Sequence, residues 1–169
     1  MTRKQHRVRR TLLVVGEGDS EEAFLKHLRD LYCGGGGGVT VTVRNAHGKG
    51  PENVVDHTIR QARIYSYDGH VAFLDTDIPW TDKLKKEARK ASIEMVGSSP
   101  CLEGLLLSIL GKRPPEKSDA CKKLTKQLLD LDLTERASYG AAFSKAVLES
   151  ARTRLPELDR LLRFYEGRQ

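Results

Sequence analysis

Long apolar runs, a secretion signal and a nucleotide-binding loop are all missing from this sequence of 169 residues. No apolar run approaches the ~18 residues of a membrane-spanning helix, so we expect no transmembrane segment. The basic N-terminus lacks the apolar segment of a signal peptide, which predicts that the chain is not secreted. The glycines at 34–38 are not followed by Gly-Lys-Ser/Thr, so they indicate a flexible connector and not a Walker loop.

Cysteine is also scarce. Cys33, Cys101 and Cys121 are the only three, and no C-x-x-C spacing occurs. This pattern argues against a disulfide framework and against a zinc site, and it is typical of a protein from the reducing cytoplasm.

The net charge of +6 is concentrated at the N-terminus. Five cations there account for most of it: Arg3, Lys4, Arg7, Arg9 and Arg10. We expect residues 1–10 to form a flexible basic tail. The tail either contacts the phosphates of DNA or RNA or is a solvated leader, and composition leaves both open.

Strand and helix patterns alternate through the first hundred residues. The expected strands cover 11–16, 39–44, 70–75 and 93–97, and the expected helices cover 20–32, 51–67 and 80–92, with a further helix from Pro100. This order predicts an α/β fold, an open parallel sheet with helices on both faces and right-handed crossovers. The core would span 11–110. A break at 111–115 would lead into a helical C-terminal extension, 111–169, packed on the core.

Three carboxylates follow two of these strands. Glu17 ends the run 11–16, and Asp75 and Asp77 end the run 70–75. Ligands of parallel sheets bind just outside the carboxyl ends of the strands, so the acids converge if the two strands are neighbours. At ~5 Å and an effective dielectric of about 20, each pair would repel by roughly 3 kcal/mol. Such a cluster holds protons at neutral pH or takes up Mg²⁺ or Mn²⁺.

Each acid also has a plainer interpretation. A glycine turn with an acidic helix cap, at Asp19 or Ser20, explains Glu21 but leaves Glu17 unexplained, and Glu21 is also a candidate supporting residue of the site. A turn with an Asp capping the next helix would explain Asp75 and Asp77, although two acids spaced by two in extended chain also share one side, as paired metal ligands need.

The fourth expected helix opens with Ser99 and Pro100. With Pro100 at its first position, Ser99 is the predicted cap, and Glu103 lies one residue past the capping-box position. Glu103 is therefore a candidate supporting acid of the site, and Cys101 is interpreted as a small core residue.

His47 and Lys49 lie in a glycine-rich loop after the second strand. Lys49 is a candidate for holding a phosphate and His47 for moving a proton. The alternative is a polar surface loop.

Three stretches together resemble the Toprim superfamily, and more narrowly its RloB-like family of bacterial restriction and phage-defence loci. Residues 15–21 (VGEGDSE) resemble the family's strand-Glu-Gly-x-Thr/Ser-Glu element, and 73–77 (FLDTD) resemble its strand-Asp-x-Asp. Residues 98–103 (SSPCLE) resemble its Ser-Asn-Pro-Cys-Phe-Glu element, which generic Toprim domains lack. The family usually has Trp after that Glu and a His further on, where this chain has Gly104 and then leucines.

The resemblance implies a four-stranded Toprim sheet and a Mg²⁺ ion held by Asp75 and Asp77, with Glu17 as ligand or acid/base. It also implies a nuclease role in defence, alongside an ATPase partner.

Two functions follow as hypotheses. The first is a metal-dependent phosphodiesterase acting on DNA or RNA, with Lys49 and the tail cations as phosphate clamps. The second is a non-catalytic subunit that uses the same pocket to bind a metal-nucleotide or a partner. A phospho-receiver domain is a third candidate, but a glycine splits Glu17 from Asp19 and no fifth strand with a terminal Lys is expected.

Overall fold

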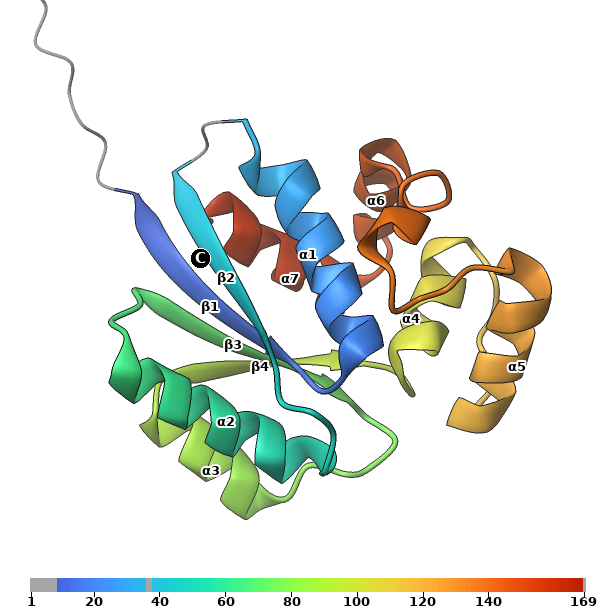
Figure 1. Ribbon diagram of the computed structural model, residues 1–169. Coiled ribbons are helices and arrows are strands. Elements are labelled where there is room, and N and C mark those ends of the chain that lie inside the picture. Colours follow the sequence, from blue (N-terminus) through green and yellow to red (C-terminus); the bar gives the residue numbers. More distant parts are fainter. Residues whose placement is uncertain (1–8, 36–37, 169) are drawn as a thin grey trace, which may run out of the picture.

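A four-stranded parallel sheet with helices on both faces forms the centre of the computed structural model, which describes residues 9–35 and 38–168 (Figure 1). The strands are β1 (Arg10–Gly16), β2 (Val39–Asn45), β3 (Gly69–Asp75) and β4 (Ile93–Ser98), in the order β2-β1-β3-β4. The helices are α1 (Asp19–Cys33), α2 (Gly50–Ile64), α3 (Asp82–Lys90), α4 (Leu102–Ile109), α5 (Ser118–Leu129), the 3₁₀ helix η1 (Arg136–Tyr139), α6 (Lys145–Arg152) and α7 (Pro156–Glu166). The expected α/β fold is confirmed.

The two central strands are apolar on both faces because each face carries its own helical layer. Leu12 and Val14 of β1 join one core, with α1, α4, α6 and α7. Leu13 and Val15 join a second core, with α2 and α3. Successive side chains of a strand point to opposite faces, so a continuous apolar run fills both cores. No described helix has the length and apolarity that crossing the bilayer requires.

The helices after residue 110 pack into the larger of these cores. Tyr139, Phe143 and Leu162 are fully buried in the same cluster as Phe24 of α1. The Tyr165 hydroxyl donates a hydrogen bond to the Leu25 carbonyl (2.9 Å). The extension therefore completes the core under the sheet.

Several helix boundaries differ from the predictions. The cap of α1 is Gly18, in place of the expected Asp19 or Ser20: its carbonyl accepts from the Glu22 N–H (3.0 Å), and the Asp19 carboxylate accepts from the Asn45 amide instead (2.7 Å). The α2 helix ends at Ile64, before the expected residue 67, because Tyr65 is extended. The α3 helix covers Asp82–Lys90 and not 80–92, because the Thr81 hydroxyl caps it by accepting from the Leu84 N–H (3.1 Å).

The start of α4 was also predicted wrongly. The helix begins at Leu102 with Cys101 as its cap, so Pro100 is not its first residue and Ser99 does not cap it. The reason is that the Pro100 carbonyl accepts hydrogen bonds from the N–H groups of Thr76 (3.1 Å) and Asp77 (2.9 Å) in the β3–α3 loop. Residues 98–101 thus form a turn that holds this loop, and Glu103 lies in the first turn of α4.

Candidate functional site

The acidic residues leave the sheet at one edge because β1 and β3 are neighbours. Gly16 pairs with Phe73, so Glu17 and Asp75 emerge from adjacent strands within about one residue of the same level. Asp75 pairs with Ser98 on its other side. Figure 1 shows these strand ends facing α4 and α5, at the carboxyl edge where ligands of parallel sheets bind. We call Glu17, Glu21, Asp75, Asp77 and Glu103 the acid cluster.

Burial and neighbouring negative charges raise the pKa values of three members of this cluster, Asp75, Glu17 and Glu21. The pKa of Asp75 rises to about 7, through burial first and then the charges of Glu21, Glu17 and Asp77, while a hydrogen bond from the Ser98 hydroxyl (2.9 Å) opposes the rise. Burial and the charge of Asp77 raise the pKa of Glu17, against a backbone hydrogen bond from Asp75. The expected convergence is therefore present as an electrostatic coupling between the two strands.

Glu21 and Glu103 extend the cluster beyond the three acids at the strand ends. Burial raises the pKa of Glu21, and the charges of Glu103 and Glu17 add to it. Glu21 also accepts a hydrogen bond from the Gly18 N–H (3.0 Å) at the start of α1. The capping interpretation of Glu21 is thus correct, and the same carboxylate faces the cluster.

Asp77 has a different set of partners. Its carboxylate accepts a hydrogen bond from the Ser118 hydroxyl (2.7 Å) at the start of α5. Since Thr81 caps α3, neither Asp75 nor Asp77 serves as a helix cap, and the capping part of the plainer interpretation of this pair is wrong. Their position next to Glu17 needs another explanation.

Lys122 brings a positive charge from α5 to the cluster. Burial opposes its protonation, yet the charges of Glu103 and Asp75 raise its pKa, and Lys122 in turn lowers the pKa of Glu17. Its side chain is exposed to solvent. Lys122 thus places an exposed cation next to partly buried carboxylates.

The donor chemistry of this cluster fits a hard divalent cation, because all five side chains are carboxylates and their repulsion would be relieved by a positive ion. The distances between the candidate ligands fit a metal ion less well. Among residues 9–35 and 38–168, no three acids, histidines or cysteines are grouped closely enough to hold a metal ion. The candidate ligands Glu17, Asp75 and Asp77 are thus adjacent, but they do not form a finished coordination shell.

The turn at 98–101 supports the site through its backbone and hydroxyls. The exposed Ser99 hydroxyl is 2.8 Å from that of Thr76, and the buried Ser98 hydroxyl reaches Asp75. Cys101 is buried, as expected for a core residue. Ser99 therefore helps to hold the loop between Asp75 and Asp77.

His47 and Lys49 are both exposed on the β2–α2 loop. The Gly48 N–H donates to the Glu17 carbonyl (2.7 Å), which joins this loop to the end of β1. The charge of His47 acts on Glu22 and His57, and Lys49 borders a cleft with Ile78 and Pro79. The loop thus flanks the acid cluster.

Part of the basic tail can be placed. Arg3, Lys4 and Arg7 lie outside the described residues. Arg9 and Arg10 are exposed at the start of β1, which is the end of the sheet opposite the acid cluster. A nucleic acid that contacts both would have to run along the length of the sheet.

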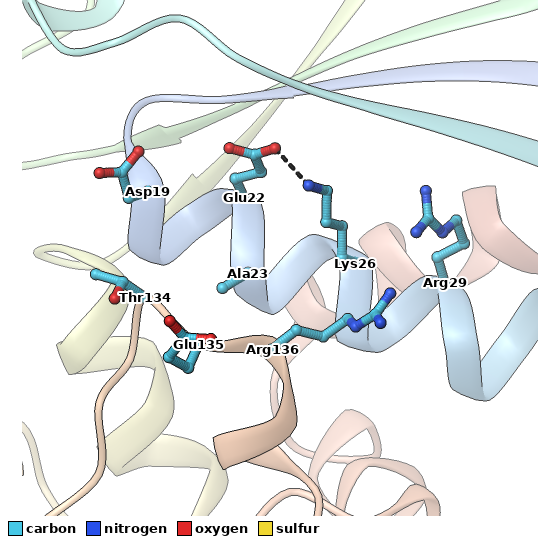
Figure 2. A pocket seen from close by; sticks show the side chains of 8 residues that line it. All are labelled: Asp19, Glu22, Ala23, Lys26, Arg29, Thr134, Glu135 and Arg136. Carbon is cyan, nitrogen blue, oxygen red and sulfur yellow. Dashed lines mark ion pairs between the residues drawn. The ribbon is translucent and has the colours of Figure 1, made fainter.

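A cleft of about 510 Å³ lies along the outer side of α1 (Figure 2). Asp19 and Glu22 line one end, and Arg29 and Arg136 line the other. Glu22 pairs with Lys26 (2.6 Å), as the dashed line in Figure 2 marks. This cleft includes none of the residues of the acid cluster.

Three contributors to the site were missed by sequence reasoning. They are Ser98, Ser118 and Lys122. Ser98 could have been found, because the residue that ends β4 must lie beside the end of β3. Nothing in the sequence connects Ser118 and Lys122 to acids more than forty positions away.

No family model matches the chain, and comparisons with curated proteins and with solved structures find no match. The RloB-like resemblance therefore depends on the three sequence stretches alone and stays a prediction.

Proposed function

We propose that this chain is a Mg²⁺- or Mn²⁺-dependent phosphodiesterase that cuts DNA or RNA. The observation that supports it best is the coupling of Glu17 to Asp75 across neighbouring parallel strands, with the pKa of Asp75 raised to about 7. Partly buried carboxylates with raised pKa values at a sheet's carboxyl edge are a candidate site for cation-assisted chemistry.

In this proposal Asp75 and Asp77 hold the cation, and Glu17 is a further ligand or the general base. A bound divalent ion supplies charge neutralisation at the phosphoryl group and a more acidic water. Lys122 of α5 and Lys49 of the β2–α2 loop contact the phosphates of the substrate. Ser98 keeps Asp75 oriented, and Ser118 does the same for Asp77.

The resemblance to RloB-like proteins extends the proposal to an antiphage or restriction system in the cytoplasm, with an ATPase as partner protein. The net charge of +6 supports a polyanionic substrate. In this proposal the basic tail and the cations Arg29 and Arg136 add contacts to the nucleic-acid backbone away from the reaction centre.

A non-catalytic subunit that binds a nucleotide or nucleic acid is the second candidate. Two observations favour it: no three ligands are grouped for a metal within the described residues, and Asp77 is already bonded to Ser118. Gly104 also replaces the Trp that the family usually has.

The test is cleavage of plasmid, single-stranded DNA and tRNA by purified protein with Mg²⁺ or Mn²⁺, alone and with the candidate ATPase. We expect Asp75→Ala to abolish cleavage and Asp56→Ala to leave it unchanged, because Asp56 is exposed on α2, where it pairs with Arg60 (3.3 Å). Absence of cleavage under all these conditions would refute the proposed phosphodiesterase activity. Defence against phage that survives Asp75→Ala would favour the non-catalytic subunit.

A further inference from the structure

A second cleft, of about 270 Å³, lies beside the acid cluster, between the start of α2 and the β3–α3 loop. Apolar side chains from both elements line it: Pro51, Ile78, Pro79 and Leu84. Lys49 and Glu52 add one charge of each sign at the same cleft. The volume is just below the ~300 Å³ of the smallest drug-sized pockets and suits one flat ring system.

Ile78 is the unusual residue of this cleft. It directly follows Asp77, yet 53% of its surface is exposed. Leu84, also in the cleft, is almost completely buried. Its exposed apolar surface lines the same cleft as Pro51 and Pro79, so a flat apolar ligand in the cleft would contact all three.

The loop that carries Lys49 is held firmly in place. His47 (φ 59°), Gly48 (φ 82°), Lys49 (φ 68°) and Gly50 (φ 79°) all have left-handed backbone conformations. The Asn53 side chain donates hydrogen bonds to the carbonyls of Ala46 and Gly48, both at 2.8 Å. A non-glycine residue rarely adopts this conformation without support from its surroundings, and here the support fixes Lys49 next to the apolar surface.

We infer that the cleft binds one unstacked base of a single-stranded nucleic acid, on the nucleotide next to the phosphate that faces the acid cluster. This inference depends on the proposed function, because Ile78 directly follows Asp77, a proposed ligand of the cation, so the same loop would serve the base and the phosphate. Proline and isoleucine sandwich the flat base, Glu52 accepts from its amino groups, and Lys49 pairs with a flanking phosphate. A duplex keeps its bases stacked, so single strands are the preferred substrate.

The first test measures binding without chemistry. In EDTA, the protein is titrated with a fluorescently labelled single-stranded oligonucleotide, with its duplex and with an abasic deoxyribose-phosphate chain of equal length. The single tryptophan, Trp80, is two residues from Ile78 and gives a second signal by fluorescence. We expect the single strand to bind roughly tenfold more tightly than the duplex or abasic chain and alone to change the Trp80 emission.

The second test compares two exposed isoleucines. Ile78→Ala should weaken single-strand binding roughly fivefold or more and leave abasic binding unchanged. Ile64→Ala removes the same methyl groups from a residue that is 64% exposed at the far end of α2, and it should change neither. Both positions are on the surface, so both variants should keep the circular dichroism of the parent.

Equal binding of the abasic and base-containing chains, or equal behaviour of the two variants, would overturn the base site. The nuclease proposal is judged separately, by cleavage in Mg²⁺. Cleavage that is insensitive to Ile78→Ala would refute the base site alone. Base-dependent binding without any cleavage would support the base site. It would refute the phosphodiesterase and favour the non-catalytic nucleic-acid-binding subunit.

Discussion

Asp75 experiences opposing influences on its charge. Burial and three neighbouring carboxylates favour the protonated form, and the Ser98 hydroxyl favours the ionised form. The first influence dominates, so near neutral pH the metal-free protein holds a carboxyl that is only partly ionised. Above neutral pH this carboxyl must ionise in a partly buried, negatively charged place, which reduces the stability of the folded protein.

The first prediction is that Asp75→Asn stabilises the metal-free protein at pH 8. The pKa of Asp75 is about 7 in the folded chain, against the ordinary aspartate value of 3.8 that applies when the chain is unfolded. The folded state therefore binds more protons between these values, and its stability falls as pH rises through this window. Asparagine removes this loss. We expect a gain of about 1 kcal/mol, or roughly 3 °C in Tm, at pH 8 and little gain at pH 4, by thermal melting in EDTA.

The matched control is Asp56→Asn, which should leave the melting temperature almost unchanged at both pH values, since Asp56 is exposed on α2. A gain for Asp75→Asn that is equal at pH 4 and pH 8 would contradict the electrostatic origin.

At the scale of elements, the turn at 98–101 and the first residues of α4 determine where the β3–α3 loop lies. The Pro100 carbonyl binds the N–H groups of Thr76 and Asp77, and α4 packs directly against the turn. Gly104 makes this close approach possible, since a Cβ there would overlap the Ser99 carbonyl oxygen and lie 2.6 Å from Pro100 Cδ. The Trp of the RloB-like pattern has no room at this position.

The second prediction is that Gly104→Ala destabilises the protein by about 2 kcal/mol, because the added methyl forces the turn and α4 apart. Thermal or denaturant melting measures this loss. Gly38→Ala is the matched control: a Cβ at Gly38 meets nothing within 4 Å, and we expect a change within about 0.5 kcal/mol. Equal stability of the two variants would contradict the packing described for α4.

Much of the element order could be predicted because strand and helix patterns differ in period. The runs ending at Gly16 and Asp75 are apolar on both faces, which indicates central strands, and they are indeed the central pair.

Helix ends were less predictable from the sequence than strands. Thr81 caps α3 with its own hydroxyl, which is a local signal that the sequence carries. Asp19 does not cap α1, because its carboxylate accepts a hydrogen bond from the Asn45 amide of β2 (2.7 Å). Contacts of this kind have no local sequence signal.

At the scale of the whole molecule, the C-terminal third is part of both the core and the site. Helix α7 packs on α1 and β4, and α5 supplies Ser118 and Lys122 to the acid cluster. The sequence predicted helices after residue 111 but not this second role, because the contacts depend on how α5 folds back over α4. A division of the chain into an active core and an accessory extension therefore does not describe its chemistry.

The last prediction concerns the contribution of the C-terminal third to folding. A chain ending at residue 110 loses four buried α7 side chains: Leu158, Leu161, Leu162 and Tyr165. At roughly 1.5–3 kcal/mol for each side chain, this loss is comparable to the 5–15 kcal/mol that stabilises a typical domain. We expect the truncated chain to melt without a cooperative transition by circular dichroism and to bind hydrophobic dyes. A chain ending at Glu166 keeps all four side chains and should melt cooperatively, close to the full-length protein. Cooperative melting of the shorter chain would show that residues 11–110 fold by themselves, and Ser118 and Lys122 would then be accessory to an independent core.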